Sequence, residues 1–483
     1  MDGGDVPGSG MESQRENHSV EKSLNVWQSQ RRQVLQGGGM VALTSLMSAT
    51  AMAQNHTIQA VRNSNSLQQG EFPDGFLWGA ATAGHQVEGG NINSDSWLLE
   101  NMKPTLFDEP SGDACDHYHR FGEDIALLPE LGLNTFRFSL EWSRIEPEPG
   151  QFSLAEIDHY RRVLQTCHRM GVTPMVTYNH FTTPRWFAGM GGWESPNASQ
   201  LFARYCAMVT SQLGELMGMV TTLNEPNLIQ LLFGIPGLQQ TKLGTIEDQE
   251  IIRKAGERMG TGLFSSWVFG DYEHIHRGLL LAHRTGYEAI KTERPELQVG
   301  VSIAMEDDQV VEPGGEGMLD KKQSLAYVPW FDVARRHADF FGVQCYSRCR
   351  IGPSGRLPPE PGVPLTDMGY EFYPEALEGA LRYTHQHLKI PLYVTENGVA
   401  TTDDTRRIEY IRRAVAGVSH CLASDIDVRG YIHWSLLDNF EWLDGYRPHF
   451  GLVSVDHKTF HRHIKPSAVY LGEIARHNHL MEG

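Results

Sequence analysis

The sequence has little of what marks several large classes of protein. Its six cysteines include no Cys-x-x-Cys pair and no metal-type spacing, so buried free thiols are expected; Cys345 and Cys349 are the one close pair, and the sequence establishes no disulfide. Lysine and arginine number 41 against 59 aspartates and glutamates, a formal net charge of −18. Nucleic acids and anionic membranes reward clustered basic residues, so both are disfavoured as partners, and a neutral or cationic small molecule fits better.

Long apolar runs are also scarce. No segment after the first fifty residues has the length of a transmembrane helix. Near the N-terminus, Arg31-Arg32 precede a Gly- and Ala-rich run that ends in Ala51-Met52-Ala53, and this stretch resembles a twin-arginine export signal. We expect residues 1–53 to be a polar leader and cleaved signal, residues 54–70 a linker, and the mature protein to be periplasmic, with no membrane contact beyond export. A buried helix or a membrane anchor is the alternative interpretation.

From Phe72 onward, short apolar runs alternate with longer amphipathic stretches, which is typical of parallel strands joined by helices. Eight runs are expected to form strands: 76–82, 135–142, 173–180, 219–226, 299–305, 340–346, 392–398 and 431–439. Because no break in composition separates them, the pattern predicts a single-domain α/β fold, a (β/α)8 TIM barrel over residues 71–483. The polar segments 235–262, 306–324 and 351–370 are then expected to be long loops on its C-terminal face.

Two glutamates end apolar strands of this predicted barrel. Glu225 ends the fourth strand and precedes Pro226, and Glu396 ends the seventh and precedes Asn397-Gly398. Strands four and seven are expected on opposite sides of the mouth, where the two carboxyls face each other. Glycoside hydrolysis needs such a pair, one carboxyl to protonate the leaving oxygen and one carboxylate to attack or to activate water. Either glutamate alone would more simply be a rim charge or a salt-bridge partner of an arginine.

Motifs along the chain resemble those of the family 1 glycoside hydrolases, the β-glucosidase family. The two signature motifs of that family, T-x-N-E-P and T-E-N-G, occur here as "TLNEP" (222–226) and "TENG" (395–398). The likeness also covers "FPDGFLWGAATAGHQVEG" (72–89), "FRFSLEWSRIEP" (136–147) and "HWSLLDNFEWLDGY" (433–446). So many motifs in the same order make the resemblance specific over nearly everything after the signal.

The resemblance implies roles for four catalytic residues. Glu396 matches the nucleophile and Glu225 the acid/base of a retaining enzyme, whose carboxyls should lie about 5 Å apart. Arg137 matches the arginine that keeps the nucleophile ionised, and Tyr346, expected at the end of the sixth strand, matches the tyrosine that hydrogen-bonds it. The charge on Glu396 should raise the pKa of Glu225 until a covalent intermediate forms.

The resemblance also implies a sugar-binding set. The residues that match family contacts to the glycone are Gln86, His180, Asn224, Trp434, Glu441 and Trp442. Three positions depart from the family pattern: His85 stands where a tyrosine is usual, and Gln344-Cys345 stand where Asn-Tyr is usual, so that Gln344 replaces an asparagine near the nucleophile. These departures put the fine glycone preference in doubt.

The implied activity is that of a retaining, exo-acting β-glycosidase, a β-glucosidase first of all, with a small β-glycoside as substrate. Neither a metal nor an organic cofactor is expected, and the sequence does not predict an oligomeric state. Two alternatives stay open: a transglycosylating β-glycosidase with the same site, and a non-catalytic sugar-binding or receptor barrel. The second is disfavoured because both carboxylates are present.

Overall fold

The computed structural model describes residues 70–235 and 246–481. The predicted export signal and all but the last residue of the predicted linker lie outside the described residues. Within the described part of the chain, no helix is long and apolar enough to cross a membrane.

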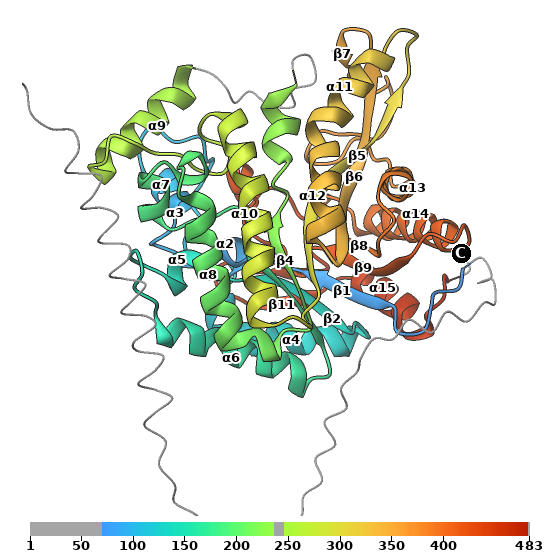
Figure 1. Ribbon diagram of the computed structural model, residues 1–483. Helices are drawn as coiled ribbons and strands as arrows, with labels where there is room; N and C mark the ends of the chain where they lie inside the picture. The colour runs from blue at the N-terminus through green and yellow to red at the C-terminus, as the bar shows by residue number, and fades with distance from the viewer. Residues whose placement is uncertain (1–69, 236–245, 482–483) are drawn as a thin grey trace, which may run out of the picture. The chain divides into compact units, whose positions relative to one another are not determined.

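Eight parallel strands close into a barrel (Figure 1). They are β1 (Leu77–Ala81), β2 (Thr135–Ser139), β3 (Thr173–Asn179), β4 (Met219–Asn224), β5 (Val299–Val310), β6 (Phe340–Gly352), β8 (Leu392–Asn397) and β9 (Val428–Trp434). Neighbours in this order pair in parallel, and β1 pairs with β9, which closes the ring. The predicted (β/α)8 fold is therefore confirmed.

The barrel strands are buried on both faces. Every residue of β2, β4 and β8 is buried, as expected for parallel strands covered by helices. Inside the barrel, apolar side chains from several strands form one cluster that includes Met175, Met219, Phe340 and Ile432. The interior is thus a packed core, and polar chemistry is confined to the C-terminal ends of the strands.

A ring of helices covers the outside of the barrel (Figure 1). The longer ones are α4 (His117–Leu131), α6 (Leu154–Arg169), α8 (Ala198–Leu213), α10 (Tyr272–Glu293), α12 (Val328–His337), α13 (Ala376–His387), α14 (Asp404–Leu422) and α15 (Pro466–His477). Several begin at a capping side chain; Ser153 accepts from the Glu156 amide at the start of α6, and Asp271 accepts from two amides at the start of α10. These caps satisfy amides that have no partner within the helix.

The predicted loops 306–324 and 351–370 are wrong in part: both begin with strand residues, and the first also ends in a helix. Strand β5 continues past Met305 to Val310, and β6 continues past Tyr346 to Gly352, where β7 (Gly355–Arg356) turns back antiparallel to it. Helix α11 (Glu316–Ala326) follows β5, and in Figure 1 this extension projects at the top of the view. Tyr346 therefore lies within its strand and not at the end of it.

The third predicted loop, 235–262, also contains regular structure. Helix α9 (Ile246–Met259) occupies its second half, and residues 236–245 lie outside the described part of the chain. Ile251 and Ala255 of this helix are buried in a small cluster beside the short helices α3 (Asp95–Asn101) and α7 (Arg185–Gly189).

The extension of β5 was not predicted, because a run of acidic residues is typical of a loop. Glu306 and Asp308 lie on the extended strand, and the buried Lys322 of α11 donates to both; its distance to Glu306 Oε2 is 2.6 Å. Arg356 of β7 donates to both Glu306 oxygens at 2.6 and 3.0 Å. Although burial alone would raise it, these cations lower the pKa of Glu306 to about 2.

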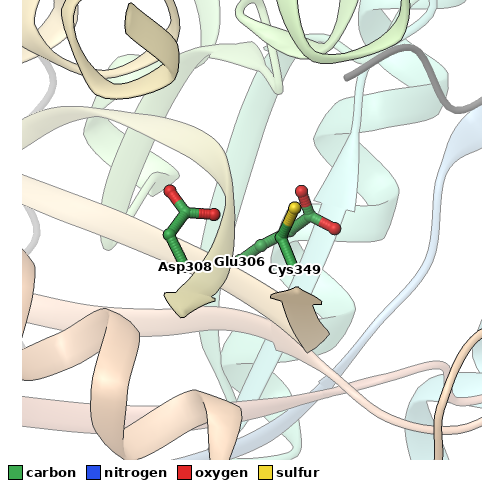
Figure 2. Close-up of side chains that lie close together, drawn as sticks. All are labelled: Glu306, Asp308 and Cys349. Carbon is green, nitrogen blue, oxygen red and sulfur yellow. The ribbon is translucent and has the colours of Figure 1, made fainter. Parts of the chain in front are cut away.

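Cys349 lies beside the same two acids, as Figure 2 shows. The ligand atoms of Glu306, Asp308 and Cys349 lie within 4.8 Å of one another, the one such trio among the residues described. Burial raises the pKa of the Cys349 thiol to about 12, so it stays protonated at neutral pH. With Lys322 bonded to both carboxylates, we interpret the group as a buried ion cluster that fastens α11 to the extended strands.

Replacement of Lys322 by methionine should therefore destabilise the fold. The substitution keeps much of the side-chain volume but leaves two acids without their shared cation, and we expect the free energy of unfolding to fall by about 3–5 kcal/mol. Lys321→Met, at the exposed neighbouring position, is the matched control and should change stability by less than about 0.5 kcal/mol. Urea unfolding of both variants checks this; equal effects would contradict the assignment.

Candidate active site

The two predicted carboxyls lie at the mouth of the barrel. Glu396 is the fifth residue of β8 and is 3% exposed, whereas Glu225 follows β4 directly and is partly exposed. Their strands are three places apart around the ring, with β5 and β6 between them, so they do not face each other across the full diameter as predicted. The charge of Glu396 nevertheless raises the pKa of Glu225, which places the two carboxyls within electrostatic reach.

Backbone geometry sets the direction of both side chains. Glu225 adopts a left-handed φ of +45°, uncommon for a residue with a side chain, and its amide donates to the Ser302 carbonyl at 2.8 Å. After Glu396, Asn397 donates to the Cys345 carbonyl at 2.6 Å. A Cβ on Gly398 would meet the Trp434 carbonyl oxygen at 2.0 Å, so only glycine fits at this exit.

Glu396 has a charged and a neutral donor, one on each oxygen. Arg137, fully buried on β2, donates to Oε1 at 2.5 Å, and the Tyr346 hydroxyl donates to Oε2 at 2.7 Å. Burial and the nearby carboxylates raise the pKa of Tyr346 well above its ordinary value, so it remains a donor. Both bonds favour the ionised form of Glu396.

The proton of the pair belongs on Glu225. Burial raises the pKa of both groups, and Arg137, Tyr346 and Gln344 offset part of the rise at Glu396. At Glu225, burial and then the charge of Glu396 push the pKa well above its ordinary value. Two interacting acids in which one is held ionised and the other protonated form the arrangement that acid catalysis beside a nucleophile requires.

Asn224 connects this pair to the predicted sugar site. Its Oδ1 accepts from Arg137 at 2.5 Å and from Gln344 at 2.8 Å, which directs its Nδ2 toward His180 Nε2 at 3.1 Å. His180 is neutral, because burial and the Arg137 charge lower its pKa well below the ordinary value. With Nε2 accepting, the proton lies on Nδ1, which has no protein partner and is free to donate to a ligand.

The other wall of the predicted sugar site consists of Gln86, Trp434, Glu441 and Trp442. Gln86 donates to the Phe440 carbonyl at 2.7 Å and to Glu441 at 3.4 Å, and its own Oε1 has no protein partner. Burial, with the charges of Glu396 and Asp444, raises the pKa of Glu441 to about 8. Trp434 and Trp442 both lie roughly parallel to His180, with ring centroids 5.7 and 6.3 Å away. The structure thus brings all ten predicted site residues together.

A family model described as Glycosyl hydrolase family 1 matches residues 68–332 and 352–480. The chain belongs to this family. The unmatched interval includes all of β6 except its last residue, and with it Gln344 and Tyr346. A site with two interacting carboxyls is what glycoside hydrolysis by this family would need.

Individual relatives agree with this assignment. Beta-glucosidase A of Acetivibrio thermocellus is 30% identical over 84% of this chain and 98% of its own. Among solved structures, a beta-glucosidase solved without ligand is 47% identical, with a TM-score of 0.78 over 83% of this chain and 98% of its own. A family 1 beta-glucosidase from Thermotoga maritima is 25% identical, with a TM-score of 0.74 over 86% of this chain and all of its own.

One aromatic residue of the site was not predicted. Trp267 stacks on Phe181, with centroids 4.3 Å apart and planes at 15°, and its centroid lies 5.6 Å from that of Trp442. Trp267 and Phe181 line a small cavity that also reaches Glu225. Trp267 lies in an irregular segment between α9 and α10 that contains no family motif, so only its size and apolar character could have drawn attention to it.

Loss of the Tyr346 hydroxyl should raise the pKa of Glu396. Tyr346→Phe removes one of the donors to the carboxylate, and because a hydrogen bond to a charged group contributes about 1.5–3 kcal/mol, the rise should be about one to two units. Carbon-13 NMR of protein labelled at the glutamate carboxyls measures it, with Glu396→Gln to assign the signal. Tyr393→Phe, a buried tyrosine on β8 itself, should leave this pKa unchanged. A Glu396 pKa that stays the same or falls in Tyr346→Phe would contradict the role.

Proposed function

We propose that the protein is a retaining, exo-acting β-glucosidase that releases terminal β-linked glucose from small glucosides or short oligosaccharides. The observation that carries the proposal is the unequal environment of the two carboxyls: Arg137 and Tyr346 donate to Glu396, whereas burial and the charge of Glu396 raise the pKa of Glu225 well above its ordinary value. Family membership and the names of the relatives support glucose as the glycone.

In the first step, Glu396 attacks the anomeric carbon while Glu225 gives its proton to the glycosidic oxygen. The carbon–oxygen bond breaks, the aglycone leaves as an alcohol, and a glycosyl ester forms on Glu396. Esterification removes the negative charge that raised the pKa of Glu225, so Glu225 is then ionised.

In the second step, Glu225 takes a proton from water as the water oxygen attacks the anomeric carbon. The ester bond breaks, Glu396 regains its negative charge beside Arg137, and glucose leaves with its configuration retained. Both protons move through Glu225, so acid and base are one residue whose pKa follows the charge on Glu396.

Polar groups without protein partners support recognition of one terminal sugar. The Nδ1–H of His180 offers a donor and the Oε1 of Gln86 an acceptor. Glu441 accepts from Gln86, and Trp434 offers a flat face for the pyranose ring. A solved relative, the beta-glucosidase of Thermotoga maritima, binds deoxynojirimycin. We propose that the same groups bind the glycone here.

Azide rescue distinguishes the two carboxyl roles. Glu396→Ala should lower kcat on an aryl β-glucoside by on the order of 10⁴-fold or more, because no group remains to attack the anomeric carbon. Azide can then enter from the face that Glu396 vacates and should give the α-glucosyl azide. In Glu225→Ala, azide should replace the water that needs a base and give the β-glucosyl azide. NMR of the products identifies the anomers; the opposite pairing, or full activity in Glu396→Ala, would refute the assignment.

We further propose export by the twin-arginine route, supported by the sequence "RRQVLQGGGMVALTSLMSATAMA" (31–53) alone. In a Gram-negative host, the wild-type chain should reach the periplasm without its first 53 residues. The double variant Arg31→Lys, Arg32→Lys should accumulate uncleaved in the cytoplasm, whereas Arg62→Lys, outside the predicted signal, should be exported normally. Fractionation with mass spectrometry of the N-terminus measures this, and export of the double variant at the wild-type level would contradict it.

A further inference from the structure

His85 lies directly behind the tryptophan wall of the site. It belongs to the short helix α2 (Gly84–Val87), one residue before Gln86, and its side chain is fully buried. Its ring stacks on the indole of Trp442, with centroids 5.6 Å apart and planes only 7° from parallel. On another side it meets the edge of Phe440 at 6.0 Å. His85 therefore contacts the sugar wall without lining it.

Hydrogen bonds at both nitrogens fix the plane of the His85 ring. Asn91 Nδ2 donates to Nδ1 at 3.2 Å, and the orientation of this amide is fixed because its Oδ1 accepts from Ser143 at 2.7 Å. With Nδ1 accepting, the proton lies on Nε2, which faces Glu100 Oε2 at 3.4 Å. Glu100 is itself held by the Ser111 hydroxyl at 2.5 Å. A phenyl or phenol ring could stack but could not make these two bonds.

Trp442 needs such support, because its backbone is strained. Its φ of +51° is left-handed, which is unfavourable for a bulky side chain and persists only where the surroundings impose it. It also follows Glu441 directly at the start of a 3-10 turn, η4 (Trp442–Asp444). Because the two residues share a peptide bond, a shift of the Trp442 backbone would also shift Glu441.

We propose that His85 is a positioning residue for glycone recognition, one that holds Trp442, and through it Glu441, the pair that by family resemblance contacts the sugar hydroxyls farthest from the anomeric carbon. The inference rests on the proposed β-glucosidase function and deepens it. It makes His85, which touches no substrate, a determinant of which sugars this enzyme accepts at the 4- and 6-positions.

Deoxy substrates test the proposal. For His85→Ala, kcat/KM on 4-nitrophenyl β-glucoside should fall about tenfold, mostly through a higher KM, because the lost stacking contributes up to about that factor. The loss should persist on the 2-deoxy analogue, because the family resemblance assigns the missing hydroxyl to Asn224, away from Trp442 and Glu441. The loss in kcat/KM should shrink to about twofold on the 4-deoxy or the 6-deoxy analogue, because each analogue lacks a hydroxyl that Glu441 and Trp442 would otherwise contact.

Two further variants keep the test decisive. Glu100→Gln keeps the volume of the side chain and weakens the bond to Nε2, so it should show the same substrate pattern more weakly even if His85→Ala does not fold. His283→Ala, another fully buried and hydrogen-bonded histidine, should give equal changes on all four substrates. Equal losses on all four in both His85→Ala and Glu100→Gln would overturn the proposal. A wild-type enzyme inactive on every one of these glycosides would instead refute the proposed function.

Discussion

The buried contact between Arg137 and Glu396 is the interaction on which the site depends. Glu396 is 3% exposed, and burial alone would neutralise it; the guanidinium at 2.5 Å and the Tyr346 hydroxyl at 2.7 Å keep it charged. That charge in turn keeps the proton on Glu225. Removal of the cation would therefore disturb both carboxyls, because the protonation of one is set by the charge of the other.

Strand pairing in the barrel fixes the geometry of the contact between Arg137 and Glu396. Register places Arg137 of β2 level with Ala81 of β1, and Ala81 level with Trp434 of β9, while Gln344 of β6 lies level with Glu396 of β8. Strand pairing thus fixes the relative positions of these side chains with a precision that a flexible loop would not give. Asn224 connects β2 to β6 by accepting from both Arg137 and Gln344, so sugar recognition and the ionisation of Glu396 share one hydrogen-bond network.

Much of this could be predicted from the sequence. The apolar runs gave the start of most barrel strands within a residue or two, because a buried parallel strand reads as an unbroken apolar run. The extension of β5 was not predicted, because acidic residues such as Glu306 and Asp308 are typical of loops. Only the folded structure shows that Lys322 of the following helix pairs with both. Likewise, the family resemblance named the ten site residues, but the bonds at both nitrogens of His85 and the stacking of Trp267 on Phe181 arise only from tertiary packing.

If Glu396 is the ionised nucleophile of the pair, it alone should become glycosylated. In a 2-deoxy-2-fluoro-β-glucoside with a dinitrophenyl leaving group, the fluorine slows both steps and the good leaving group speeds the first, so that the ester accumulates. Peptide mapping by mass spectrometry should place the fluoroglucosyl group on the peptide that contains "VTENG" (394–398), at Glu396. A label on Glu225, or steady release of fluoroglucose with no labelled peptide, would contradict the account.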